Sequence, residues 1–249
     1  MAGHNKWSKI KRKKGVADQR RGKLWSKLAR NIIVAAKHGG GNPAENLALR
    51  YAIDKAKVEN MPADTIDKAI LKGTGELGAA EYVPVVYEGY GPGGVAIIVD
   101  ALTDNPHRTA PEVKKIFERG GGKMGATNCV SWNFATRGVF TIPAAGQTED
   151  ALMEIALDAG ADDVKGDGEN FEITCEVAQF ESVRKALEAK KVAFSSGEIT
   201  KLPGSTVTVD AETGGKILRL IEAFEDNDDV QTVYSNYEMP DEVMAQLGG

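Results

Sequence analysis

The spacing of the apolar residues changes near residue 73, and this change restricts the folds that the chain can adopt. Before it, apolar residues recur every three or four positions, as on one face of a helix; after it, alternating segments rich in Val and Ile separate shorter helical ones. Residues 73–80, GTGELGAA, have the composition of a linker. The 249 residues also exceed the usual size of one domain. We therefore predict an α+β protein whose first domain is helical.

Three helices are predicted before the linker, and together they form a small bundle over residues 1–76. The first covers 17–37 and is followed by three glycines. The second is predicted to begin with Asn42 as its cap, and the third covers 63–72 and ends at Gly73. The side chains expected to face the bundle core are Leu24, Trp25, Leu28, Ile32, Ala35, Ala36, Leu47, Tyr51, Ala52, Ala56, Ile66, Ala69 and Ile70.

The rest of the chain predicts two α+β domains. Strands at 139–142, 162–165, 171–175 and 192–200 alternate with helices at 149–159 and 180–189, which is the ferredoxin-like βαββαβ order. This unit, residues 137–203, is predicted to be inserted into a discontinuous domain of residues 81–136 and 204–240. That domain has a ββαβ part (strands 82–87, 95–101 and 128–134, helix 109–119) and a βαβ part (strands 206–209 and 230–234, helix 211–224).

Positive charge is concentrated at the start of the chain. Residues 3–37 hold 12 Lys or Arg and one acid, Asp18, with Trp7 and Trp25 among them. Residues 1–72 carry a net charge of +11 and residues 73–249 a net charge of −16, although the whole chain is at only −5. Cations neutralise phosphate and an indole can stack on a base, so this composition favours nucleic-acid binding; a solvated basic tail is the alternative. The acidic remainder is expected to meet a basic protein or to orient the first domain.

Other features restrict the location and the chemistry. Cys129 and Cys175 match no zinc or redox spacing and are expected to be small strand residues in a reducing cytoplasm. We expect neither a secretory signal, nor a membrane span, nor a metal or other cofactor, and no dimer seam is evident, so a monomer is predicted.

No catalytic constellation is evident. The cluster most typical of an enzyme is 103–108, TDNPHR, but Asn105-Pro106 favours a turn with helix-capping neighbours. The glycine-rich run 89–94 lies between two strands and predicts a hairpin turn, not a phosphate loop. The acidic run 225–229 is expected to be a solvated loop. We therefore predict no enzymatic activity.

Several stretches together resemble the YebC/PmpR family. They include the segments AGHNKW (2–7), IKRKK (10–14), NMP (60–62), YEGYGPGG (87–94) and TDNPHR (103–108), and the similarity spans essentially the whole chain. Two positions depart from the family pattern: Asn5 stands where Ser is usual, and Asn31 stands where Glu is frequent, which makes the first helix more cationic.

The resemblance implies a three-domain, non-enzymatic cytoplasmic protein. Members of the family are described as probable transcriptional regulators, and others act in translation on the ribosome or as a mitochondrial translational activator. We therefore expect a DNA-binding regulator or, alternatively, a ribosome-associated factor that binds ribosomal RNA or tRNA; a protein-interaction module is a further alternative. The residues predicted to contact the nucleic acid are His4, Lys6, Trp7, Lys9, Lys11, Arg12, Lys13, Lys14, Arg20, Arg21, Lys23 and Lys27.

Overall fold

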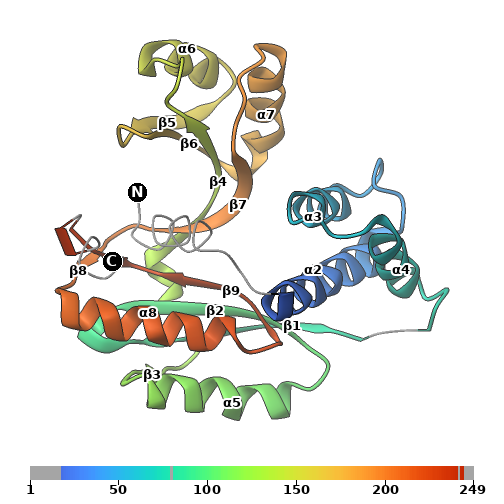
Figure 1. The fold of residues 1–249 in the computed structure, drawn as a ribbon, viewed down its shortest axis with the longest axis vertical. Helices are drawn as coiled ribbons and strands as arrows, with labels where there is room; N and C mark the ends of the chain where they lie inside the picture. The colour runs from blue at the N-terminus through green and yellow to red at the C-terminus, as the bar shows by residue number, and fades with distance from the viewer. Residues whose placement is uncertain (1–17, 79–80, 241, 244–249) are drawn as a thin grey trace. The chain divides into compact units, whose positions relative to one another are not determined.

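The computed structural model describes residues 18–78, 81–240 and 242–243, with the backbone alone for 18–20 (Figure 1). These residues form two compact units. One contains residues 132–206, and the other contains the described residues of 18–131 and 207–243. The protein has the predicted α+β fold, with helices first and antiparallel sheets after them. The three-domain division, with its boundaries at 76, 81, 137 and 203, stays a prediction.

The predicted helical bundle is present. It consists of α2 (Asp18–Gly39), α3 (Leu47–Val58) and α4 (Ala63–Thr74). Its core gathers the apolar stripe of α2 with those of the two shorter helices. The buried side chains are Leu28, Ile32, Ile33, Ala36, Leu49, Ile53, Ala56, Met61, Ile66 and Ala69.

The start of α3 differs from the prediction. Asn46, not Asn42, is the N-cap: its Oδ1 accepts from the Leu49 N–H at 3.1 Å, while its Nδ2 donates to the carbonyls of Ala35 and Gly40, each at 2.8 Å. The later start rotates the buried face, so Leu49 is fully buried and Leu47 is 44% exposed. The Ala35 carbonyl on α2 and the Gly40 carbonyl just after it hold Asn46 in the capping position.

The sequence predicted that the third helix ends at Gly73, but Gly73 lies inside α4. The helix continues to Thr74, and Gly75, with a left-handed φ of 89°, is its C-cap. A Cβ added at Gly73 would lie 2.5 Å from the Ile33 carbonyl oxygen and 2.6 Å from the Ala36 Cβ. Gly73 is therefore the residue that lets α4 approach α2.

We predict that Gly73→Ala lowers the free energy of unfolding by about 1–3 kcal/mol, because two helix backbones must move apart. Gly22→Ala on α2 is the matched control, since its surroundings are open, and alanine should stabilise that helix by about 0.5–1 kcal/mol. Urea denaturation followed by circular dichroism measures both. Stabilisation by both substitutions would show that α2 and α4 do not pack this closely.

The discontinuous part of the chain forms a four-stranded sheet in the order β3-β1-β2-β9. Its strands are β1 (Val83–Tyr90), β2 (Ala96–Thr103), β3 (Lys123–Met124) and β9 (Val230–Ser235). Helices α5 (Pro106–Arg119) and α8 (Ala211–Glu225) pack on the same core as Ile97 and Val99 of β2. Segments on both sides of residues 132–206 thus share one sheet, as predicted (Figure 1).

Three local predictions for this part of the chain had different outcomes. The run 89–94 is a hairpin turn, as predicted: η1 (Pro92–Gly94) joins the antiparallel strands β1 and β2. Strand 206–209 does not enter the sheet; β8 (Val207–Thr208) pairs instead with β10 (Tyr237–Glu238) as a separate parallel pair. Helix α5 begins at Pro106, so the predicted helix start at Thr109 was wrong.

The predicted strand 128–134 was also wrong over most of its length. Residues 128–131 form a loop held by the buried carboxylate of Glu88, which accepts backbone N–H bonds from Asn128, Val130 and Ser131, each at 2.9 Å. Burial raises the pKa of Glu88, but these hydrogen bonds outweigh it and hold the pKa below its usual value. Cys129 therefore lies in a loop, whereas Cys175 is the predicted buried strand residue.

The other unit has the ferredoxin-like order β4-α6-β5-β6-α7-β7. Its elements are β4 (Phe134–Pro143), α6 (Glu149–Asp158), β5 (Ala161–Gly166), β6 (Asn170–Cys175), α7 (Phe180–Ala189) and β7 (Ser196–Pro203), with short turns η2 (Ser131–Asn133) and η3 (Val177–Gln179). The sheet is antiparallel with the order β5-β6-β4-β7, which is the predicted topology. Phe140 is fully buried at its centre, 4.6 Å from Phe180 between ring centroids.

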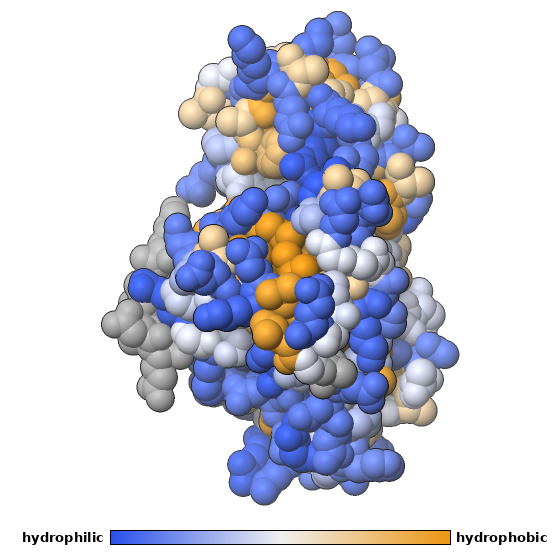
Figure 2. Space-filling model, turned by 90° about the vertical axis from the view of Figure 1, so that its right-hand side faces the viewer, coloured by the Kyte–Doolittle hydropathy of each residue, from blue (hydrophilic) through white to orange (hydrophobic). Residues whose placement is uncertain are grey.

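Charged and polar side chains cover most of the surface visible in Figure 2, and apolar residues gather in one patch among them. Within 18–78, 81–240 and 242–243, no helix combines the length and the apolar composition needed to cross a membrane.

Candidate nucleic-acid interface

Most of the predicted nucleic-acid contacts lie outside the described residues. These are His4, Lys6, Trp7, Lys9, Lys11, Arg12, Lys13 and Lys14. Arg20 lies in the first turns of α2, where only the backbone is described. The remaining three, Arg21, Lys23 and Lys27, have described side chains on α2, and the first two of these are exposed.

The α2 cations Lys23, Lys27 and Arg30 recur every three or four residues, so they form one stripe along the helix. We call these three residues the α2 stripe. It meets the segment in which α8 ends and β9 begins. Lys27 Nζ donates to the Glu225 carbonyl at 2.6 Å, and Lys23 Nζ donates to the Asp226 carbonyl at 3.2 Å. The last carbonyls of a helix have no partner inside it and carry its negative dipole end, so two ammonium groups stabilise the end of α8.

Lys27 is partly buried by this contact. Desolvation lowers the pKa of Lys27 to about 8, although the nearby carboxylates of Glu225, Asp228 and Asp226 act in the opposite direction. Lys27 therefore remains mostly charged at neutral pH while its ammonium group has been stripped of much of its water.

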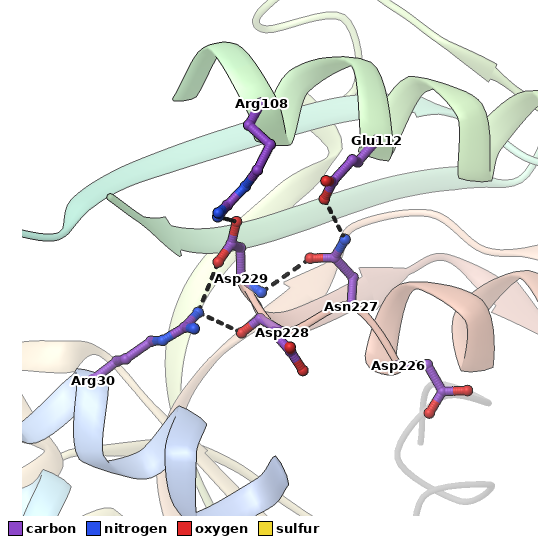
Figure 3. A pocket seen from close by; sticks show the side chains of 7 residues that line it. All are labelled: Arg30, Arg108, Glu112, Asp226, Asn227, Asp228 and Asp229. Carbon is purple, nitrogen blue, oxygen red and sulfur yellow. Dashed lines mark hydrogen bonds and ion pairs between the residues drawn. The ribbon is translucent and has the colours of Figure 1, made fainter. Parts of the chain in front are cut away.

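Arg30 continues the contact into a buried acidic centre (Figure 3). Its Nη1 donates to the Asp228 carbonyl at 2.6 Å and to Asp229 Oδ1 at 2.8 Å. On the other side, Asp229 Oδ2 accepts from Arg108 and from the Thr109 hydroxyl of α5, and from Thr103 of β2. One buried carboxylate thus links the helical bundle to a strand and a helix of the sheet.

An open pocket of about 360 Å³ lies beside this carboxylate. Its lining residues are Arg30, Arg108, Glu112, Asp226, Asn227, Asp228 and Asp229. In Figure 3, Arg30 and Arg108 approach Asp229 from opposite sides, and the Glu112 carboxylate accepts from the Asn227 amide at 3.1 Å. With four carboxylates and two guanidinium groups, the lining is acidic overall, so the pocket is poorly suited to phosphate.

Asp229 is ionised in this setting. Burial raises the pKa of its carboxyl group, but the hydrogen bonds from Thr109 and Arg108 and the charges of Arg108 and Arg30 together hold the pKa below its usual value. The prediction that residues 225–229 form a solvated loop was therefore wrong at Asp229, which is 3% exposed. Nothing in the local sequence distinguishes Asp229 from its neighbours, because the partners that bury it lie on three other elements.

The cluster 103–108 has a structural role. Asn105 is the N-cap of α5, although the sequence predicted a turn at Asn105-Pro106 ahead of a helix start at Thr109: the Asn105 Oδ1 accepts from the Arg108 N–H at 3.1 Å. Thr103 and Arg108 are both bonded to Asp229, so they contribute to the contact between elements. Among the described residues, no group of three or more His, Cys, Asp or Glu could hold a metal ion.

Trp25 is partly buried in the helical bundle. Its indole packs on the core of the helical bundle, and its Nε1 donates to the Glu59 carbonyl at 3.0 Å. Asn31 follows Arg30 of the α2 stripe and makes an uncharged contact: its side-chain amide donates to Gln231 Oε1 at 3.1 Å.

Two family models match the chain. One, described as the TACO1/YebC protein N-terminal domain, matches residues 5–76, and the other, described as the TACO1/YebC second and third domain, matches residues 82–237. The chain belongs to the TACO1/YebC family. The resemblance seen in its motifs is thereby confirmed.

Relatives in the TACO1/YebC family match over nearly the full length. Proteins from Natranaerobius thermophilus and Maridesulfovibrio salexigens are each 50% identical over 247 residues, covering 98% and 99% of this chain and 99% of each relative. Both are named probable transcriptional regulatory protein, which describes regulators and not enzymes. A crystal structure of a conserved hypothetical protein from Aquifex aeolicus is similar, with a TM-score of 0.81 and 45% identity, over 91% of this chain and 94% of that one.

Proposed function

We propose that this chain is a non-enzymatic, nucleic-acid-binding regulator of gene expression whose basic N-terminal segment contacts the phosphate backbone. One observation carries the proposal: residues 3–37 hold 12 Lys or Arg against a single acid, whereas residues 73–249 have a net charge of −16. Binding releases counterions from phosphate, which favours association with either DNA or RNA. The names of the relatives, probable transcriptional regulatory proteins, agree with a role in gene expression.

RNA on the ribosome, either ribosomal RNA or tRNA, is the second candidate target. A DNA regulator that reads base edges places a helix in the major groove. Helix α4 presents the exposed residues Asp64, Asp67, Lys68 and Lys72, and its two carboxylates would face the phosphates of a groove. This polar set favours a protein that contacts backbone over one that reads DNA sequence.

Replacing Lys11, Arg12, Lys13 and Lys14 together with alanine tests the proposal. We expect at least about tenfold weaker binding to a random-sequence DNA duplex and to an RNA hairpin. The slope of log affinity against log salt should flatten by about 0.9 for each duplex phosphate that the variant no longer neutralises, and by about 0.7 on single strands. The matched control removes four exposed lysines elsewhere, Lys57, Lys68, Lys72 and Lys185, and should change affinity and slope much less. Equal effects in both variants would show that net charge, not the N-terminal segment, drives binding.

Sedimentation separates the two targets. If RNA on the ribosome is the target, the wild-type protein should co-sediment with ribosomes at low salt and the four-alanine variant should stay at the top of the gradient. A wild-type protein that stays at the top, and binds one promoter at least about 10³-fold tighter than random DNA, would instead favour transcription.

A further inference from the structure

The α2 stripe, Lys23, Lys27 and Arg30, is already bound within the protein. Each of the three donates to a backbone carbonyl between Glu225 and Asp228, and Asn31 adds a hydrogen bond to Gln231. These positions lie at the end of α8 and in the loop that leads to β9, and we call residues 225–231 the α8–β9 segment.

We infer that the α8–β9 segment competes with nucleic acid for the α2 stripe, so that nucleic acid engages these cations only when the segment is displaced. This inference rests on the proposed function. It adds an autoinhibitory contact that regulates how much of the basic surface is available to phosphate.

The segment resembles phosphate in the chemistry that it offers. Helix-end carbonyls present partial negative charge, and the carboxylates of Glu225, Asp226 and Asp228 surround them. An ammonium or guanidinium group that donates to these oxygens has correspondingly fewer donors for phosphate. The exposed carboxylates of Asp226 and Asp228 also repel an approaching nucleic acid.

The contact between the α2 stripe and the α8–β9 segment can open without leaving the buried Asp229 carboxylate unpaired. If Arg30 leaves Asp229 Oδ1, Asp229 Oδ2 keeps Arg108 and the hydroxyls of Thr109 and Thr103. The other two members of the α2 stripe donate to carbonyls that water can reach once the segment moves, so water repays part of the cost of opening the contact. Several phosphate contacts are sufficient to offset that cost.

A crosslink between positions 31 and 231 tests the competition directly. In the variant Asn31→Cys/Gln231→Cys, made in a Cys129→Ser background, a short bismaleimide joins the two introduced thiols. Asn31 and Gln231 are uncharged, so these two substitutions leave the net charge of the protein unchanged. We expect the crosslinked protein to bind the RNA hairpin and the random-sequence duplex about tenfold more weakly than the same protein before crosslinking. Its salt slope should be flatter by up to about 0.9 for each cation withheld.

Neutralising the segment should have the opposite effect. Asp226→Asn/Asp228→Asn removes two exposed carboxylates and should tighten binding about threefold to tenfold. The control, Asp64→Asn/Asp67→Asn, makes the same change of net charge at exposed positions of α4. It should tighten nucleic-acid binding less than the first pair does.

Unchanged affinity after crosslinking, or equal effects of the two neutralised pairs, would overturn the inference. In that case the wild-type chain would still bind both probes with a steep salt slope, and the proposed function would stand. A wild-type chain that binds neither probe would overturn both.

Discussion

Asp229→Ala is expected to lower the free energy of unfolding by about 2–4 kcal/mol, because it removes the buried acceptor of two hydroxyls and leaves the part-buried Arg30 with backbone carbonyls alone. The Asp229 side chain is 5% exposed and pairs with Arg30 at 2.8 Å on one oxygen and with Arg108 on the other. Removing it also leaves the hydroxyls of Thr103 and Thr109, both fully buried, with one acceptor fewer.

The neighbouring Asp228 provides the control for this measurement. It is exposed, and it contacts Arg30 through its backbone carbonyl, so Asp228→Ala should change stability by no more than about 0.5 kcal/mol. Urea denaturation followed by circular dichroism and Trp fluorescence measures both variants. Equal, small decreases in stability would show that Asp229 does not hold α2 against the sheet.

The same carboxylate gives stability a defined pH dependence. Because the folded protein holds the pKa of Asp229 below its unfolded value, ionised Asp229 stabilises the fold above the unfolded pKa of about 3.9, and this contribution disappears as pH falls through the folded pKa. Glu88, whose pKa is also depressed, acts in the same direction. Unfolding measured from pH 6 downward should therefore show a smaller decrease of stability in Asp229→Ala than in the wild type.

Phe140→Ala is expected to lower the stability of residues 132–206 by about 3–5 kcal/mol. Phe140 is fully buried, stacks on Phe180 and meets Phe194 edge to face at 5.5 Å, so truncation leaves a cavity that these rings cannot fill. Ile199→Ala on β7, where the side chain is 38% exposed, is the control and should cost much less.

Peptide-resolved hydrogen exchange on the Phe140→Ala variant tests whether the predicted inserted domain folds as a separate unit. If residues 137–203 fold on their own, as the three-domain prediction holds, Phe140→Ala should accelerate exchange in β4–β7 and leave α2, β2 and α8 unchanged. Equal acceleration in all these elements would show that the chain unfolds as one cooperative unit and would contradict the separate inserted domain.

The sequence alone determined the elements whose signals are local. The order βαββαβ follows from alternation and helical spacing within short windows, and α7 begins and ends at the predicted residues, 180 and 189. The hairpin at 89–94 follows from turn chemistry in the same way. Family membership was also evident from motifs spread along the chain. Charge segregation predicted a basic N-terminal segment that binds nucleic acid, and this role and the domain boundaries stay predictions.

Tertiary structure decided the features that depend on distant partners. The cap of α3 is Asn46 because only that side chain reaches the Ala35 and Gly40 carbonyls, and this choice buries Leu49. Gly73 lies where two helices approach closely, and not at a helix end.

Asp229 is the clearest case. In the sequence it is the last of several similar acids, but in the fold it is the one that Arg30, Arg108 and Thr109 surround. Burying a carboxylate is favourable only when its charge is paired and its oxygens are hydrogen-bonded. Those partners are 120 or more positions away in the sequence, so packing alone brings them together.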